Sequence, residues 1–147
     1  MAAIEARLQR LEDLAEIHQL FIDYGVYLDA GDFDRYAELF ALDGQVKLGP
    51  MGKATGRDEI KALMTRALVG ATGNSFHIIS SPQVELDGDR ATSRVMWSVI
   101  ERTKDGNAKL SMVGSHQDEL VRENGRWRIQ LRRGLIDIPG VYKGTGA

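Results

Sequence analysis

The first part of the chain carries apolar residues with the spacing of an α-helix. They recur at offsets of three, four or seven residues, on one face that we expect to be buried: Ile4, Leu8, Leu11, Ala15, Ile22 and Gly25. We predict that this helix runs to about Ala30, because Gly31 can adopt the left-handed conformation that often follows a helix.

Two shorter helices and a short extended segment are predicted next. Asp32 can cap the second helix, and Thr55 with Asp58 and Glu59 resembles a capping box for the third. Between them, Asp43-Gly44 predicts a turn into an extended piece from Gln45 to Leu48. The apolar sides of the two helices are Phe33, Tyr36, Ala37, Leu39 and Phe40, and Ile60, Leu63, Met64, Ala67 and Leu68.

The second half of the chain has the pattern of an antiparallel sheet. Four β-rich runs lie between Ser75 and Ile138, separated by three hairpin-type turns: Asp87-Gly88, Asp105-Gly106 and Asn124-Gly125. With the helices, this pattern predicts a single α+β domain over residues 1–147, in which a four-stranded meander and a short extra strand curve around three N-terminal helices. We expect the glycine-rich tail, about residues 140–147, to be flexible.

Composition narrows the range of functions. The chain has 147 residues, a net charge of −2 and no basic block, so we expect neither a nucleic-acid nor a membrane partner. It has no cysteine, which removes thiolate chemistry, and no apolar run near the roughly 20 residues that cross a bilayer. The N-terminus lacks the apolar core of a signal peptide, and we expect a cytoplasmic protein.

Motifs for metals and cofactors are also missing. The three histidines are scattered without an HxH or HExxH pair, so we expect no metal site. There is no glycine-rich nucleotide motif and no GxSxG serine elbow. Acid–base chemistry without a cofactor and plain ligand binding remain as classes of function.

Asp29 is the acidic residue in the most apolar context. It follows Ile22 by seven residues and Leu11 by eighteen, which places it on the apolar stripe of the first helix. A carboxylate that faces the interior costs several kcal/mol unless it is paired or hydrogen-bonded. Asp29 therefore needs a partner or a wet cavity, or else it caps the turn from Gly31 to Phe33.

His77 is the natural partner for Asp29. It lies among the apolar residues of Phe76-His77-Ile78-Ile79, at the start of the first meander strand. A carboxylate that fixes its tautomer turns a histidine into a usable general base. The competing interpretation is structural, because a lone histidine in a strand is more often a satisfied structural group.

Other candidates lie on the later strands. His116 shares strand parity with Met112, and either lines a pocket or lies on the outer face. Arg132 has the opposite parity to Trp127, so both point inward only if the strand bulges. The other side chains that we expect to shape a substrate pocket are Tyr24, Met64, Phe76, Trp97, Met112 and Leu135.

Two stretches of the sequence resemble the SnoaL-like branch of the nuclear transport factor 2 superfold. One is the run from Tyr24 to Asp34 with the following Leu39-Phe40-Ala41-Leu42-Asp43-Gly44; the other is Asp118-Glu119-Leu120 with the segment from Asn124 to Ile129. The resemblance extends from about Leu11 to Ile138. It implies a cone-shaped fold, in which a bent sheet wraps a long helix and a deep pocket, and assembly as a trimer or dimer.

Within this family, the pattern is most similar to scytalone dehydratase and hexachlorocyclohexane dehydrochlorinase. The resemblance implies that Asp29 orients His77, that His77 removes a proton from carbon, and that Arg132 stabilises a leaving group or an oxyanion. Two positions depart from the pattern. Leu28 stands where the dehydratase has a tyrosine, and His116 stands where the dehydrochlorinase has one.

The expectation is therefore a cofactor-independent lyase, of dehydratase or other β-elimination type, that acts on a small and largely apolar substrate. Two rival interpretations remain open. One is an isomerase of the ketosteroid-isomerase type, which conserves the mass of its substrate whereas elimination does not. The other is a non-catalytic module for binding small ligands or for oligomerisation, because this fold also serves as a scaffold.

Overall fold

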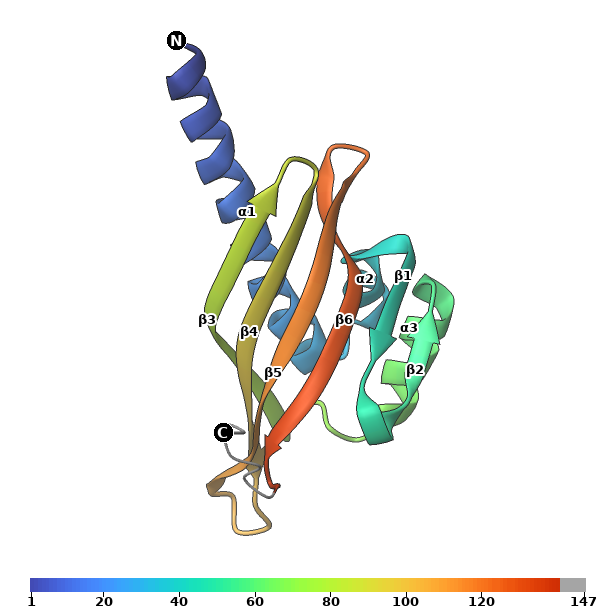
Figure 1. Cartoon of the computed structure of the whole chain (residues 1–147). Coiled ribbons are helices and arrows are strands. Elements are labelled where there is room, and N and C mark those ends of the chain that lie inside the picture. The colour runs from blue at the N-terminus through green and yellow to red at the C-terminus, as the bar shows by residue number, and fades with distance from the viewer. Residues whose placement is uncertain (141–147) are drawn as a thin grey trace, which may run out of the picture.

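The structure, a computed structural model, describes residues 1–140, so the expected flexible tail lies outside the described residues except for Gly140. Its helices are α1 (Ala2–Ala30), α2 (Phe33–Glu38) and α3 (Arg57–Ala67), with a short 3-10 turn, η1 (Gly49–Met51). Its strands are β1 (Phe40–Lys47), β2 (Lys53–Thr55), β3 (Ser75–Asp87), β4 (Arg90–Arg102), β5 (Ala108–Glu123) and β6 (Arg126–Ile138). Figure 1 shows α1 lying across one face of the long strands, with α2, α3, β1 and β2 at the far side of the sheet.

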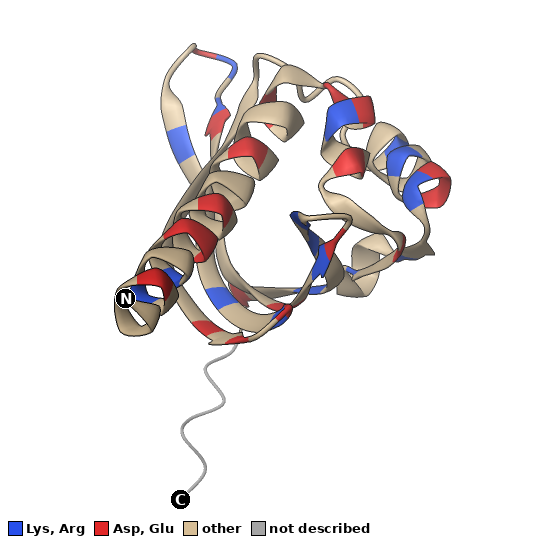
Figure 2. Ribbon diagram, turned by 90° about the horizontal axis from the view of Figure 1, so that it is seen from above, with Lys and Arg blue, Asp and Glu red and all other residues tan. Residues whose placement is uncertain are grey.

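The strands form one curved sheet in the order β2-β1-β6-β5-β4-β3, and β3 to β6 are the antiparallel meander that the turn signals predict. The Asn124-Gly125 turn has φ values of 52° and 76°, which fit the residue types that a tight hairpin needs. Seen from above, the sheet curves between α1 and the shorter helices without closing on itself (Figure 2). The predicted α+β class, with helices against a curved sheet, is confirmed.

Two details of the predicted sheet are wrong. The sheet is mixed, because β1 runs parallel to β6, and the extra strand starts at Phe40 instead of Gln45 and is followed by a sixth strand, β2. The pairing of β1 with β6 shifts register between Phe40 and Gln45. A Cβ atom on Gly44 would meet the Ile129 carbonyl oxygen at 2.9 Å. Asp43-Gly44 is therefore an irregular point inside a strand, where the backbones come close, and not a turn before one.

The buried face of α1 also differs from the prediction. Ile4, Leu8, Leu11 and Ile22 are each more than half exposed, whereas the buried side is formed by Ile17, Leu20, Phe21, Tyr24, Gly25 and Leu28. Figure 1 shows that the first turns of α1 extend beyond the edge of the sheet, so nothing in the described chain covers them. Ile22, further along the helix, is exposed because it lies on a different side from the buried Leu20, Phe21 and Tyr24. The C-terminal end agrees with the prediction, since α1 stops at Ala30 and Gly31 is left-handed with a φ of 71°.

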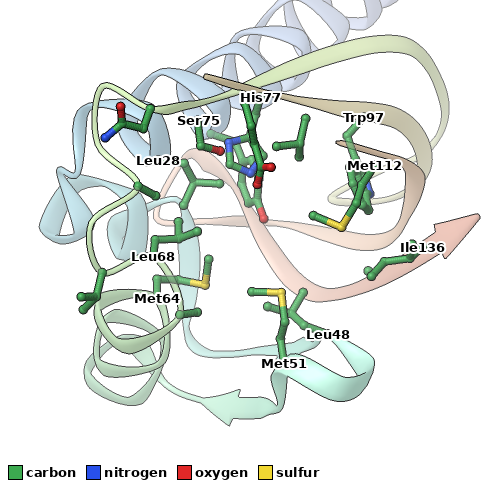
Figure 3. Close-up of a pocket in the computed structure, with 18 of the residues that line it drawn as sticks. Leu28, Leu48, Met51, Met64, Leu68, Ser75, His77, Trp97, Met112 and Ile136 are labelled. Atoms are coloured by element: carbon green, nitrogen blue, oxygen red, sulfur yellow. The ribbon is translucent and has the colours of Figure 1, made fainter. Parts of the chain in front are cut away.

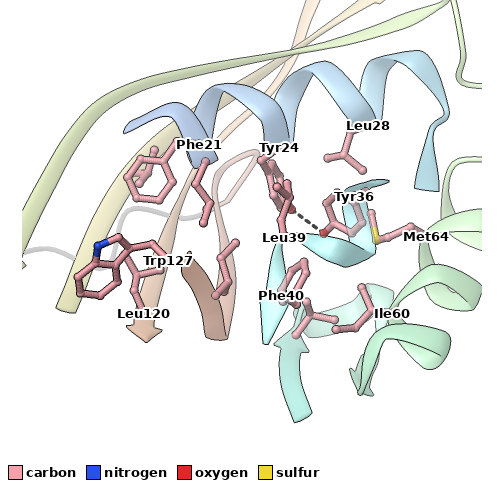
Figure 4. Packing of buried hydrophobic residues seen from close by; sticks show 14 of the residues in the cluster. Phe21, Tyr24, Leu28, Tyr36, Leu39, Phe40, Ile60, Met64, Leu120 and Trp127 are labelled. Carbon is pink, nitrogen blue, oxygen red and sulfur yellow. Dashed lines mark hydrogen bonds between the residues drawn. The ribbon is translucent and has the colours of Figure 1, made fainter. Parts of the chain in front are cut away.

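A buried carboxylate fixes α1 to the sheet. Asp13 accepts hydrogen bonds from Nη1 and Nη2 of Arg122 at 2.8 and 3.1 Å, and from the indole Nε1 of Trp127 at 3.1 Å. The Arg122 hydrogen bond is the largest of the effects that lower the pKa of Asp13 below its ordinary value. From this anchor, the core extends along α1 through Phe21 and Tyr24 to Tyr36 and Phe40 (Figure 4).

Candidate active site

A cavity of about 590 Å³ lies between the C-terminal half of α1, α3 and the inner face of the meander. Most of its wall is apolar, with methionines and leucines from the helices and the η1 region facing residues of the strands (Figure 3). Its volume falls in the range of cavities that enclose small organic ligands. The aliphatic and thioether side chains labelled there are Leu28, Leu48, Met51, Met64, Leu68, Met112 and Ile136.

Asp29 and His77 are in direct contact at the edge of this cavity. The Nδ1 atom of His77 lies 2.8 Å from Oδ1 of Asp29, and the backbone N–H of His77 donates to Oδ1 and Oδ2 at 3.0 and 3.1 Å. Both side chains are largely buried, with 20% of Asp29 and 16% of His77 exposed. Asp29 thus binds the ring and the main chain of one residue, 48 positions away in the sequence.

This contact sets the protonation pattern of the imidazole. A carboxylate only accepts hydrogen bonds, so Nδ1 carries the proton that is donated to Asp29, and Nε2 keeps a lone pair. His77 belongs to the wall of the large cavity, whereas Asp29 does not. Both residues also border a second cavity of about 420 Å³ between α1 and β3. The geometry provides a histidine with one nitrogen held and one nitrogen available as a base.

His116 lies on the inner face, and it lines the cavity together with Trp97. Burial lowers the pKa of His116 well below its ordinary value, and the positive charge of Arg132 adds to the effect, so the ring is neutral near pH 7. Two buried polar atoms, Nδ1 of His116 and Nε1 of Trp97, have no hydrogen-bond partner in the described part of the chain. Such atoms are uncommon in protein interiors and often mark functional regions.

Arg132 points inward, as the bulge hypothesis requires, but it does not reach the cavity. The pairing of β5 with β6 shifts register between Glu119 and Leu120, and this shift lets Trp127 and Arg132 both face the interior. Arg132 is 1% exposed and forms a two-point ion pair with Asp118, with Nε–Oδ1 and Nη2–Oδ2 distances of 2.7 and 2.8 Å. Its guanidinium Cζ lies 4.2 Å from the ring centre of Tyr24, which does line the cavity. Arg132 therefore acts on the cavity only through other side chains.

The cavity wall contains Tyr24, Met64, Trp97, Met112 and His116 from the expected set of pocket residues. Phe76 and Leu135 are not part of it, because alternation along a strand turns each to the outer face while the neighbouring His77 and Ile136 face inward. The sequence interpretation missed wall residues from the β1–α3 region. Those residues, Leu48, Met51 and Leu68, have no polar neighbours that would distinguish them from ordinary core residues.

Within residues 1–140, no three His, Cys, Asp or Glu side chains are grouped so that they could hold a metal ion. In the same part of the chain, no helix is both long enough and apolar enough to span a membrane.

Comparison with known proteins gives a consistent picture. A family model described as a SnoaL-like domain matches residues 9–133. An uncharacterized protein of Mycobacterium tuberculosis, Rv2910c, is 30% identical over 125 residues, which is 84% of each chain. A solved NTF2-like protein with a cystatin-like fold from Novosphingobium aromaticivorans superposes with a TM-score of 0.86 at 30% identity, over 95% of this chain and 92% of that one.

Two further solved structures are related to enzymes named above. A putative scytalone dehydratase from Novosphingobium aromaticivorans has a TM-score of 0.74 and 25% identity, and the match covers 88% of this chain and 87% of that one. The crystal structure of LinA has a TM-score of 0.80 at 18% identity, covering 95% and 99% of the two chains. At that identity, the second likeness concerns the fold alone.

Proposed function

The chain belongs to the SnoaL-like domain family, and from that premise we propose that it is a cofactor-independent lyase in which His77 removes a proton from carbon. The single observation that carries the proposal is the 2.8 Å contact between Nδ1 of His77 and Oδ1 of Asp29 at the wall of an apolar cavity. The fold is of a type that binds small ligands. The likeness to a putative scytalone dehydratase supports elimination as the reaction class.

In the proposed reaction, Nε2 of His77 takes a proton from a carbon next to an activating group such as a carbonyl. The imidazolium that forms is stabilised by the negative charge of Asp29, which also keeps the ring in one orientation. The electrons of the C–H bond form a new double bond as the group on the next carbon leaves. The apolar wall excludes water and strengthens these electrostatic interactions.

The cavity also indicates the kind of substrate. Its volume of about 590 Å³ and its leucine and methionine lining suit a small, largely apolar molecule, such as a cyclic ketone with one or two rings. Two charged side chains, Glu101 and Arg102, belong to the lining, but most of the wall is apolar, so a heavily charged substrate would lose most of its hydration without compensation. We propose a cyclic carbonyl compound with a leaving group on the β-carbon.

The test is to incubate the protein with a panel of cyclic β-hydroxy ketones and to follow product mass. Loss of water supports elimination, whereas a product of unchanged mass supports isomerisation at the same base. His77→Ala should abolish turnover, and His18→Ala, which alters an exposed histidine on α1, should not. Turnover that survives His77→Ala, or binding of the ketones without any reaction, would contradict the lyase and favour a binding module.

We also propose that the chain forms a homo-oligomer, a trimer or a dimer, through the outer face of the sheet. Apolar residues from three strands lie together there: Ile78, Val113 and Ile138 belong to one row across β3, β5 and β6, and Leu135 lies in the next row. Ile78, Leu135 and Ile138 are between 41% and 63% exposed. Ser98 on β4 lies in the same row between Ile78 and Val113, and an exposed surface with this share of apolar residues is typical of a protein interface.

A further inference from the structure

Two tyrosine hydroxyls share one hydrogen bond beside the cavity. The hydroxyl of Tyr36 donates to that of Tyr24 at 3.1 Å (Figure 4). Each hydroxyl brings one proton, so the pair has a second proton that this bond does not use. Among the described residues, no acceptor is bonded to it.

The unused proton belongs on Tyr24. Tyr36 is fully buried and is not part of the cavity wall, so an unbonded proton there would have nothing to meet. Tyr24 is 3% exposed and lines the cavity, where a ligand oxygen can accept its proton. Burial raises the pKa of Tyr36 well above its ordinary value, so Tyr36 keeps its proton, and the hydrogen bond directs that proton to the Tyr24 oxygen.

Two groups beside Tyr24 direct positive charge or a hydrogen-bond donor at it. The guanidinium of Arg132 lies over its ring at 4.2 Å, and Tyr36 donates to its oxygen. Both interactions become stronger as negative charge develops on the Tyr24 oxygen. The ion pair with Asp118 holds Arg132 in this place, which gives the buried arginine a role although it does not reach the cavity.

We propose that Tyr24 is the proton donor to the departing group, and that this group is a hydroxyl which leaves as water. The inference rests on the proposed function, and it narrows the substrate class to cyclic β-hydroxy carbonyl compounds. His77 takes the proton from the α-carbon, the C–H electrons form the C=C bond, and the C–O bond breaks. The departing oxygen takes the Tyr24 proton. Proton return from the His77 imidazolium to the tyrosinate, directly or through water, restores both groups.

The type of leaving group follows from the donor. Hydroxide is a poor leaving group and departs readily only when it is protonated, so a site that expels it needs an acid. Halide and carboxylate groups depart without a proton. A buried hydroxyl with a proton to donate therefore assists the departure of hydroxide and does little for the departure of a halide or a carboxylate.

The first arm of the test compares leaving groups. Tyr24→Phe should slow elimination of water from β-hydroxydecalone by roughly a hundredfold or more, and leave elimination of acetate from β-acetoxydecalone within about threefold. Tyr27→Phe, a change on the same helix away from the cavity wall, is the matched control. Tyr36→Phe should slow only the elimination of water from β-hydroxydecalone, and by a smaller factor than Tyr24→Phe does, because Tyr24 still has a proton to donate. Equal losses on both substrates in Tyr24→Phe would overturn the proposal.

The second arm does not depend on turnover. In the His77→Ala background, which lacks the base, the protein should bind β-hydroxydecalone roughly three- to tenfold more tightly than decalone, as one added neutral hydrogen bond predicts. Adding Tyr24→Phe should remove that preference in NMR titrations. If the first protein shows no preference, the proposal for Tyr24 is overturned whatever the turnover assay shows. If the preference is present but wild type turns over neither β-hydroxydecalone nor β-acetoxydecalone, the proposed lyase activity is wrong, whereas the proposed hydrogen bond from Tyr24 to a ligand hydroxyl is supported.

Discussion

At the scale of single residues, Asp29 has two tasks, because its carboxylate bonds both the ring and the main-chain N–H of His77. Asp29→Asn keeps an oxygen for the main chain but loses the charge that stabilises an imidazolium and fixes the tautomer. We expect kcat to fall by roughly three to four orders of magnitude, as for the corresponding change in a serine protease triad. Asp23→Asn, on the same helix, is the control. A kcat close to that of wild type would exclude the pair as the base.

The burial of His116 predicts how the stability of the fold depends on pH. Its folded-state pKa is depressed, chiefly by burial and also by Arg132 and His77, whereas the unfolded chain titrates near the ordinary value. As the pH falls below that ordinary value, about 6.5, the unfolded state takes up a proton first, so stability is lost at up to about 1.4 kcal/mol per pH unit. Above it, this residue contributes no pH dependence.

The measurement compares urea unfolding of wild type and His116→Phe at several values between pH 8 and pH 5. The two curves of stability against pH should run parallel at the upper end and diverge at the lower end, with wild type falling more steeply. Parallel curves over the whole range would mean that His116 accepts a proton in the folded state.

Single residues were predictable from the sequence where an unusual residue type stands in an apolar context. The contact between Asp29 and His77 was anticipated in that way, although the stripe on which Asp29 was placed is largely exposed. No such signal marks the Tyr24 and Tyr36 pair in the sequence, because tyrosines on the apolar side of a helix look like ordinary core residues. Only the fold shows that their hydroxyls meet.

At the scale of secondary structure elements, the packing of β5 on β4 depends on one glycine. A Cβ atom on Gly114 would clash with the Leu135 carbonyl oxygen and with Cζ2 of Trp97, so backbone and ring would both have to move. We expect Gly114→Ala to destabilise the fold by at least about 2 kcal/mol and to change the near-UV spectrum of Trp97.

Gly134→Ala is the matched comparison on the neighbouring strand. Its Cβ would meet the end of the Leu48 side chain at 2.9 Å, which can turn away, and we expect a loss below about 1 kcal/mol. Thermal unfolding of the two variants checks the difference. Equal stabilities would mean that Trp97 is not held in place by the bare backbone at Gly114.

The elements themselves were predictable to different degrees. Hairpin turns depend on local backbone conformation, so Asn124-Gly125 located its turn correctly. The pairing of β1 with β6 depends on contacts between distant segments, and a local pattern such as Asp43-Gly44 does not reveal it. The prediction of the buried face of α1 was wrong for the same reason. Which residues of the helix are buried depends on where the distant sheet lies, and the apolar spacing continues beyond the part that the sheet covers.

At the scale of the whole molecule, the two faces of the meander serve different purposes. Alternation sends His77, Trp97 and His116 to the cavity, and sends Ile78 and Leu135 to the outside. Acidic and basic residues are interspersed over the ribbon, which favours specific contacts over general attraction to a charged surface (Figure 2). An interface on the outer face would therefore leave the cavity lining unchanged, and would stiffen the strands that carry it.

This arrangement predicts that assembly and chemistry can be separated. Leu135→Glu places a charge in the exposed apolar patch, and we expect light scattering after size exclusion to show a smaller species than wild type, because a buried unpaired charge opposes association. Leu42→Glu, at a residue that is 65% exposed on β1, should leave the mass unchanged. If both variants keep the wild-type mass, the outer face is not the interface. If Leu135→Glu dissociates and still binds decalone, the cavity is complete within one chain, because none of its wall residues comes from a second copy.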